Sequence, residues 1–170
     1  ILVGGGNQWT CGSHSSFYND YKTMVDTEIA RAAGADVSGV WARSGDGVAA
    51  TVTVTNLSGV TLSNVANGAR VSVIVYEDGN VGLTGHPIRG YGSTVLSSDL
   101  ASGATTTVSV SVSSLSSGSS WGSLHAVATL DYYVWSAGRY DNLQTAVLTP
   151  SWVRGFDVNA DLNADLLWRN

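Results

Sequence analysis

From residue 35 to residue 150 the chain repeatedly alternates apolar and polar side chains, as strands with one buried face do. The alternation is clearest in Val48–Thr55 and Thr105–Val112, where most apolar positions are valine. The same argument predicts further strands at Val37–Arg43, Arg70–Glu77, Leu124–Tyr133 and Leu143–Leu148. Between them, Gly82–Thr94 is rich in glycine and is predicted to be an irregular connection.

Apolar residues recur at helical spacing near the N-terminus, from about Ser16 to Ala33. The residues of this apolar stripe are Phe17, Tyr21, Met24, Val25, Ile29 and Ala32. Ser15 or Ser16 can cap the start of the helix, and Gly34 can end it. The sequence therefore predicts one N-terminal amphipathic helix.

About seven short strands without a strand–helix–strand rhythm favour an antiparallel β-sandwich. The run Val52-Thr53-Val54-Thr55-Asn56 before a glycine turn resembles bacterial immunoglobulin-like and fibronectin type III-like modules. The resemblance extends over residues 35–150 and implies a mainly β, Ig-like sandwich used as a scaffold or for binding. Asn56-Leu57-Ser58 is also a glycosylation sequon, although the same residues are common in turns.

Residues 1–34 combine a strand, a glycine turn, a second short strand and the predicted helix. This order is similar to the last third of a thioredoxin-like fold, which some secreted bacterial proteins join to an immunoglobulin-like domain. The redox Cys-x-x-Cys pair of that family has no match here, and Cys11 does not correspond to it. The resemblance implies a remnant scaffold without the redox chemistry.

Residues 151–170 carry oxygen-bearing side chains at every second position, the arrangement by which a short loop surrounds a hard cation. The candidate calcium ligands are Asp157, Asn159, Asp161, Asn163 and Asp165. The segment is similar to the start of an FG-GAP, or VCBS, repeat. That resemblance implies side-chain ligation by the four residues other than Asn163, which would offer its backbone carbonyl.

One position departs from the calcium-loop pattern. Leu162 stands where the family prefers glycine, and a branched residue at positive φ costs on the order of 1 kcal/mol. The alternative is a solvated Asp/Asn turn before the strand Leu166-Leu167-Trp168. An unpaired strand of this kind could add to the sheet of a neighbouring domain or of another copy.

Charge and composition narrow the classes of partner. The net charge is −5 and only 12% of residues are charged, so there is no basic patch for nucleic acid. No stretch approaches the roughly 20 apolar residues of a membrane span. Cys11 is the single cysteine, which excludes an internal disulfide and favours a small buried hydrophobe over a bridge to another segment or chain.

The chain opens on Ile1-Leu2-Val3 rather than on a methionine, which indicates a processed piece of a longer polypeptide. The scarcity of lysine and the abundance of Ser, Thr and Gly are typical of extracellular or surface proteins of bacteria. We therefore expect a secreted module.

Catalytic motifs are not evident in the sequence. His14, His86 and His125 are far apart and lack metal-binding spacing, and no nucleophile elbow or phosphate-binding loop occurs. Four aromatics instead cluster in the sequence around Ser136-Ala137-Gly138: Tyr132, Tyr133, Trp135 and Tyr140. Such side chains stack on sugar rings or form protein contacts, or else close the end of the sandwich.

Three functions follow from these patterns. The first is a non-catalytic structural or adhesive module, stabilised by calcium and assembling with a neighbouring domain or subunit. The second is a carbohydrate-binding module that uses the aromatic cluster. The third is a fragment of a secreted thioredoxin-like redox protein. None of the three is an enzyme acting through residues of this chain.

Overall fold

The computed structural model describes residues 2–3, 8–9, 17–65, 68–79, 85–115 and 121–151. The fold is mainly β with one helix, as the sequence predicts. The sheet strands are β3 (Ala35–Ser44), β4 (Gly47–Asn56), β5 (Arg70–Glu77), β6 (Ile88–Val95), β7 (Thr105–Val112), β8 (Leu124–Val134) and β9 (Arg139–Pro150). A 3₁₀ turn, η2 (Trp121–Ser123), precedes β8.

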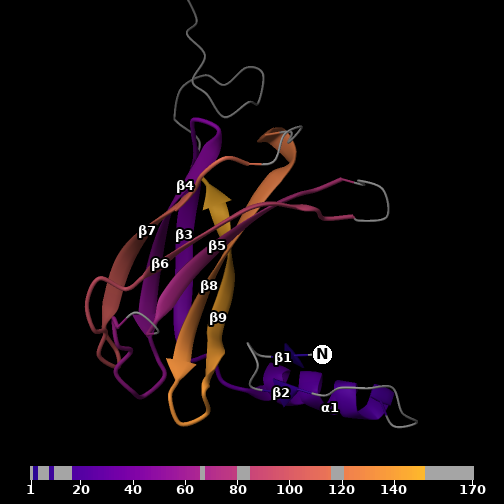
Figure 1. Ribbon diagram of the computed structural model, residues 1–170, viewed down its shortest axis with the longest axis vertical. Coiled ribbons are helices and arrows are strands. Elements are labelled where there is room, and N and C mark those ends of the chain that lie inside the picture. The colour runs from indigo at the N-terminus through magenta and orange to yellow at the C-terminus, as the bar shows by residue number, and fades with distance from the viewer. Residues whose placement is uncertain are drawn as a thin grey trace, which may run out of the picture.

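The strands form one seven-stranded sheet in the order β6-β5-β8-β9-β3-β4-β7, which folds over into two layers (Figure 1). One layer is β6-β5-β8-β9 and the other is β3-β4-β7. The layers are joined where β9 runs parallel to β3, with Val40 opposite Thr149 and Trp41 opposite Pro150. The other strand pairings among the described residues are antiparallel, so the expected antiparallel sandwich contains one parallel joint.

The core lies between the two layers and follows from the alternation in the sequence. Val52 and Val54 of β4 and Val71, Val73 and Val75 of β5 belong to this one core, and all five side chains are 0% exposed. The intervening threonines of β4 lie on the outer face instead. There they form hydroxyl pairs with β7, with Thr55 Oγ1 2.9 Å from Thr105 Oγ1.

Strand β6 corrects the sequence prediction, which assigned an irregular connection to Gly82–Thr94. The glycines that suggested a loop are needed where β6 crosses closely over β7. A Cβ atom on Gly92 would lie 2.2 Å from the Ser111 carbonyl oxygen, and one on Gly90 would lie 2.6 Å from Val112 Cγ1. The two edges of the sheet can therefore approach each other closely only because these positions lack side chains.

Strand β9 is also longer than the predicted Leu143–Leu148. It begins at Arg139 and continues to Pro150, although proline cannot donate to a strand ladder and is rare inside central strands. Proline is tolerated here because it is the last residue of the strand, where Ser151 N donates to Trp41 O at 2.6 Å.

The N-terminal part consists of helix α1 (Phe17–Ala30) and the short antiparallel strands β1 (Leu2–Val3) and β2 (Gln8–Trp9), which lie beside it (Figure 1). The predicted apolar stripe of the helix is only partly covered. Met24 is 8% exposed, whereas Tyr21 and Ile29 are 39% and 78% exposed. The assignment of residues 1–34, 35–150 and 151–170 to separate segments stays a prediction.

Candidate functional site

Three of the four predicted aromatics meet at the hairpin between β8 and β9. The ring of Tyr133 contacts Trp135 and Tyr140 edge-on, with centroid distances of 4.8 and 5.2 Å. Trp135 is nevertheless 61% exposed. Tyr132 does not join them, because it points to the opposite face of β8 and packs against the core. The structure thus contains a cluster of three residues, which we call the hairpin cluster.

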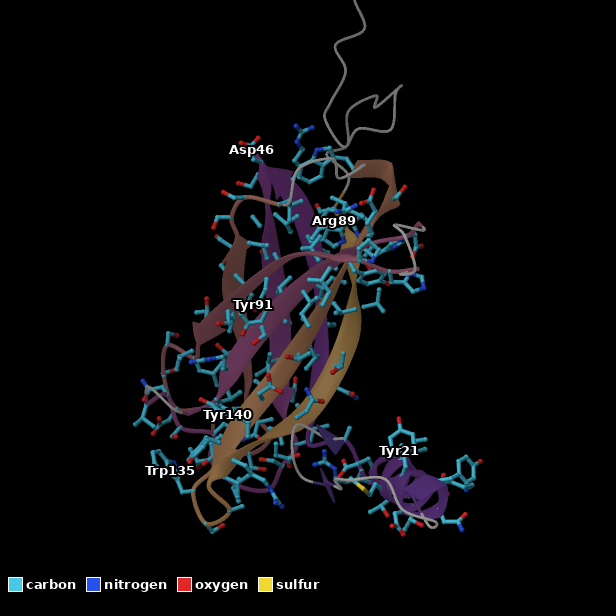
Figure 2. The ribbon with its side chains drawn as sticks, turned by 45° about the vertical axis from the view of Figure 1, so that its right-hand side comes forward. Tyr21, Asp46, Arg89, Tyr91, Trp135 and Tyr140 are labelled. Atoms are coloured by element: carbon cyan, nitrogen blue, oxygen red, sulfur yellow. The ribbon has the colours of Figure 1, made fainter. Side chains whose placement is uncertain are left out.

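A groove of about 270 Å³ continues from this cluster across the outer face of the β6-β5-β8-β9 layer. It is lined by Arg70, Ser72, Tyr91, Asp131 and Tyr140, which come from all four strands of that layer. Figure 2 shows Tyr91, Tyr140 and Trp135 following one another down this layer toward the tip of the hairpin. The hairpin cluster is therefore one end of an elongated surface with aromatic side chains and both signs of charge.

Hydrogen bonds hold Ser72, Tyr91 and Asp131 in place in the groove. Asp131 accepts from Thr129 Oγ1 at 3.0 Å and from Asn142 Nδ2 at 3.0 Å. The Tyr91 hydroxyl lies 3.2 Å from Ser72 Oγ. Hydrogen bonding by Ser72, and less strongly by Ser93, lowers the pKa of the Tyr91 phenol below its ordinary value of 10.0. The groove is thus a preformed polar surface.

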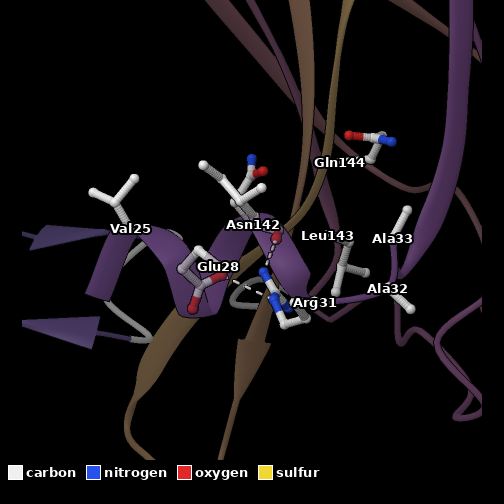
Figure 3. Close-up of a pocket in the computed structure, with 9 residues that line it drawn as sticks. Val25, Glu28, Arg31, Ala32, Ala33, Asn142, Leu143 and Gln144 are labelled. Atoms are coloured by element: carbon white, nitrogen blue, oxygen red, sulfur yellow. Dashed lines mark hydrogen bonds and ion pairs between the residues drawn. The ribbon is translucent and has the colours of Figure 1, made fainter. Parts of the chain in front are cut away.

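A second groove, of about 390 Å³, lies where the end of α1 meets β9 (Figure 3). The Arg31 guanidinium crosses it and donates to Glu28, to Asp141 Oδ2 at 2.8 Å and to the Asn142 carbonyl at 2.8 Å. Asp141 Oδ1 is buried without a hydrogen-bond partner in the described part of the chain. Because its polar groups join the helix to the sandwich, we interpret this groove as a structural joint.

Burial raises the pKa of Asp141 above its ordinary value of 3.8, and Arg31 opposes this shift only in part. A raised folded-state pKa stabilises the folded protein fully below the ordinary pKa, and the contribution is lost as the pH rises through the folded-state pKa. We therefore expect the stability of the wild type relative to Asp141→Asn to fall as the pH rises from below to above the ordinary pKa of 3.8.

Urea unfolding of both proteins across this pH range measures that difference. Asp36→Asn, which removes an exposed carboxylate on β3, is the matched control. A difference that stays constant or grows with rising pH would contradict the assignment.

Two of the three histidines come together although 39 positions separate them in the chain. His86 Nδ1 and His125 Nε2 lie 2.9 and 2.8 Å from the two carboxylate oxygens of Asp78. The ring of Tyr76 stacks on His125 at a centroid distance of 5.2 Å. Sequence spacing carries no sign of this cluster, because it arises from the pairing of Tyr76 with His125 across β5 and β8.

The predicted calcium ligands Asp157, Asn159, Asp161, Asn163 and Asp165 lie outside the described residues, as do Cys11 and His14. Within the described residues, no three His, Cys, Asp or Glu side chains gather in a way that could hold a metal ion. No helix in the same part of the chain is long and apolar enough to cross a membrane.

Arg70, Ser72, Tyr91 and Asp131 are the site residues that the sequence analysis missed. The sequence does indicate part of this set, since Arg70 and Ser72 occupy the polar face of one predicted strand and Asp131 lies in another predicted strand. Tyr91 carried none, because it falls in the segment predicted to be a loop. The strand order places these residues together.

No protein-family model and no curated protein sequence matches the chain. Solved structures similar to parts of it include DesR, a β-glucosidase from Streptomyces venezuelae in complex with D-glucose, with 17% identity over 68% of this chain and 14% of that one, at a TM-score of 0.38. A GH20 exo-β-N-acetylglucosaminidase from Vibrio harveyi is 15% identical over 69% of this chain and 18% of its own, at a TM-score of 0.30. A GH3 β-glucosidase from Bifidobacterium adolescentis is 18% identical over 69% of this chain and 16% of its own, at a TM-score of 0.28. The chain spans less than a fifth of each.

Proposed function

We propose that the chain is a non-catalytic, extracellular carbohydrate-binding module that holds glycans on the outer face of the β6-β5-β8-β9 layer. The observation that carries the proposal is the exposed indole of Trp135, 61% exposed although Tyr133 braces it at 4.8 Å. A rigid aromatic surface left open to solvent gains free energy when the apolar face of a sugar ring covers it. The adjoining groove offers charged and hydroxyl groups for the hydroxyls of the same sugar.

We further propose that residues 35–150 are related to immunoglobulin-like and fibronectin type III-like sandwiches. The distribution of β3, β4 and β7 to one layer and of β5, β6, β8 and β9 to the other supports this relation. Such sandwiches commonly bind through an end loop or a sheet face, which agrees with the position of the hairpin cluster.

The structural or adhesive alternative rests on residues 166–168 as an added strand, and these lie outside the described residues. The redox alternative rests on residues 1–34, of which the described elements are β1, β2 and α1. Neither alternative accounts for the row of aromatic side chains on this layer, of which Tyr91 and Trp135 are exposed, so we prefer the carbohydrate-binding function.

Replacing Trp135 by Ala is expected to weaken glycan binding about tenfold or more, because a stacking contact contributes roughly 1–2 kcal/mol. Calorimetric titration with laminarin, xylan, galactomannan and chitosan oligosaccharides measures the effect. Tyr18→Ala is the matched control, since Tyr18 is a 71% exposed aromatic on α1, far from the groove that Arg70 and Asp131 line.

The proposal also predicts that the wild type releases no reducing sugar from any glycan it binds. It fails if the wild type binds none of the four probes, or if Trp135→Ala and Tyr18→Ala bind equally well.

A further inference from the structure

Arg70 and Asp131 lie directly opposite each other on β5 and β8, yet they do not form an ion pair. Asp131 is held by Thr129 and Asn142. Within the described residues, the Arg70 guanidinium makes no hydrogen bond or ion pair, and it lies over the Tyr140 ring, 5.9 Å from the centroid. A donor fork and an acceptor thus line the same groove without satisfying each other.

A ligand that binds in this groove must complement both groups. A ligand carboxylate would suit Arg70 but would be repelled by Asp131, and a ligand ammonium would meet the opposite problem. Sugar hydroxyls have neither difficulty, because a hydroxyl oxygen can accept from a guanidinium while its hydrogen is donated to a carboxylate. Neighbouring hydroxyls of an uncharged ring can satisfy both side chains at once.

The walls of the groove fit the same ligand. Tyr91, which lines the groove, is 57% exposed, and Trp135 of the adjoining hairpin cluster is 61% exposed, so this surface is open rather than closed around a single ring. The aromatics follow one line from mid-sheet to the hairpin (Figure 2). Such an open row suits consecutive residues of a polysaccharide better than an isolated monosaccharide.

We propose that the groove selects internal segments of uncharged hexopyranose polymers, with neighbouring hydroxyls of one ring bound between Arg70 and Asp131. This inference rests on the proposed function and specifies its ligand class. Trp135 then supplies affinity for any sugar ring, whereas Arg70 and Asp131 supply the selection for an uncharged one. The two roles can be separated by mutation.

The test compares a neutral with an acidic polysaccharide. Laminarin and polygalacturonate are titrated in a calorimeter into the wild type, Asp131→Asn, Arg70→Gln and Trp135→Ala, with Asp36→Asn as the control for loss of a carboxylate elsewhere. Circular dichroism melts establish that each variant is folded. Arg70→Gln and Asp131→Asn change the groove independently, so failure of one to fold leaves the other informative.

The wild type is expected to bind laminarin at least tenfold more tightly than polygalacturonate, since the acidic polymer places carboxylates near Asp131. Arg70→Gln and Asp131→Asn should each weaken laminarin binding about tenfold, because each removes charge-assisted hydrogen bonds to hydroxyls. Asp131→Asn should also reduce the ratio by which laminarin is bound more tightly than polygalacturonate. The Asp36→Asn control should bind as the wild type does.

Two results overturn the inference while leaving the proposed function intact. One is binding that Trp135→Ala weakens but Arg70→Gln and Asp131→Asn leave unchanged. The other is a wild-type preference for polygalacturonate. A wild type that binds neither polymer, nor any of the glycans named above, overturns the proposed function and the inference together.

Discussion

Replacing Trp41 by Ala is expected to lower the free energy of unfolding by about 3–5 kcal/mol. Trp41 lies on β3, is 1% exposed and is among the largest fully buried side chains in the core. Its removal leaves a cavity between two packed layers that cannot close over it, and a loss of this size is a large part of the stability of a single domain. Urea unfolding monitored by far-UV circular dichroism measures the change.

Trp41→Phe is the informative control. The Trp41 Nε1 hydrogen is buried without an acceptor among the described residues, so phenylalanine removes an unpaired donor along with part of the volume. The two effects oppose each other, and we expect a net loss of about 1–2 kcal/mol. Equal losses for Trp41→Phe and Trp41→Ala would show that the indole nitrogen has a hydrogen-bond partner outside the described residues.

The second large effect is expected at Asn56, the last residue of β4, whose side chain is 0% exposed. Its amide nitrogen donates to the carbonyls of Val60 and Leu100 at 2.7 and 2.9 Å. Its amide oxygen accepts from the backbone nitrogen and the hydroxyl of Ser58 at 2.9 and 2.7 Å. One buried side chain thus fixes the turn after β4 to the segment that precedes β7.

Asn56→Ala removes the four hydrogen bonds of this buried amide and leaves the Leu100 and Val60 carbonyls with only their bonds from Leu62 N and Ser58 Oγ. We expect the free energy of unfolding to fall by about 2–4 kcal/mol. Asn56→Asp keeps the size but replaces the donor by an acceptor that faces two carbonyl oxygens. A buried unpaired charge makes this change at least as costly, on the order of 3–5 kcal/mol.

Ser58→Ala, which removes one hydroxyl from the same turn, is the matched control and should cost about 1 kcal/mol or less. Chemical unfolding of the three variants under one set of conditions orders them. An Asn56→Asp protein as stable as the wild type would mean that the donor role of the amide is misassigned.

The same contacts bear on the sequon Asn56-Leu57-Ser58. The amide nitrogen that would carry a glycan is buried and donates two hydrogen bonds in the folded protein. Of the two interpretations that the sequence allowed, the structure favours the turn. An asparagine that binds its own backbone two residues onward is a common way to stabilise such a turn.

Much of the sheet was predictable because buried valines occur at every second position on several strands. Arg70–Glu77 and Thr105–Val112 were predicted with the bounds that β5 and β7 have in the structure. Strand β6 was not, because Gly90 and Gly92 are typical of loops in the sequence, while the reason for them is the close approach of β7 from the opposite edge of the sheet. Close approach between strands that do not pair leaves no local pattern.

The candidate site also contains residues that the sequence predicts and residues that it does not. Tyr133, Trp135 and Tyr140 were predicted together because one hairpin connects them. Tyr132 packs against the core instead, since neighbouring residues of a strand point to opposite faces. Arg70 and Asp131 meet only through the pairing of β5 with β8, which alternation alone does not determine.

The parallel joint between β3 and β9 has a mechanical consequence. The chain enters β3 beside α1 and leaves β9 at the opposite end of the sandwich (Figure 1). Tension applied to the chain on either side of the domain would therefore pull the two strands past each other along their length. Their hydrogen bonds, including that from Ser151 N to Trp41 O, would then be loaded in shear and would have to break together rather than one after another.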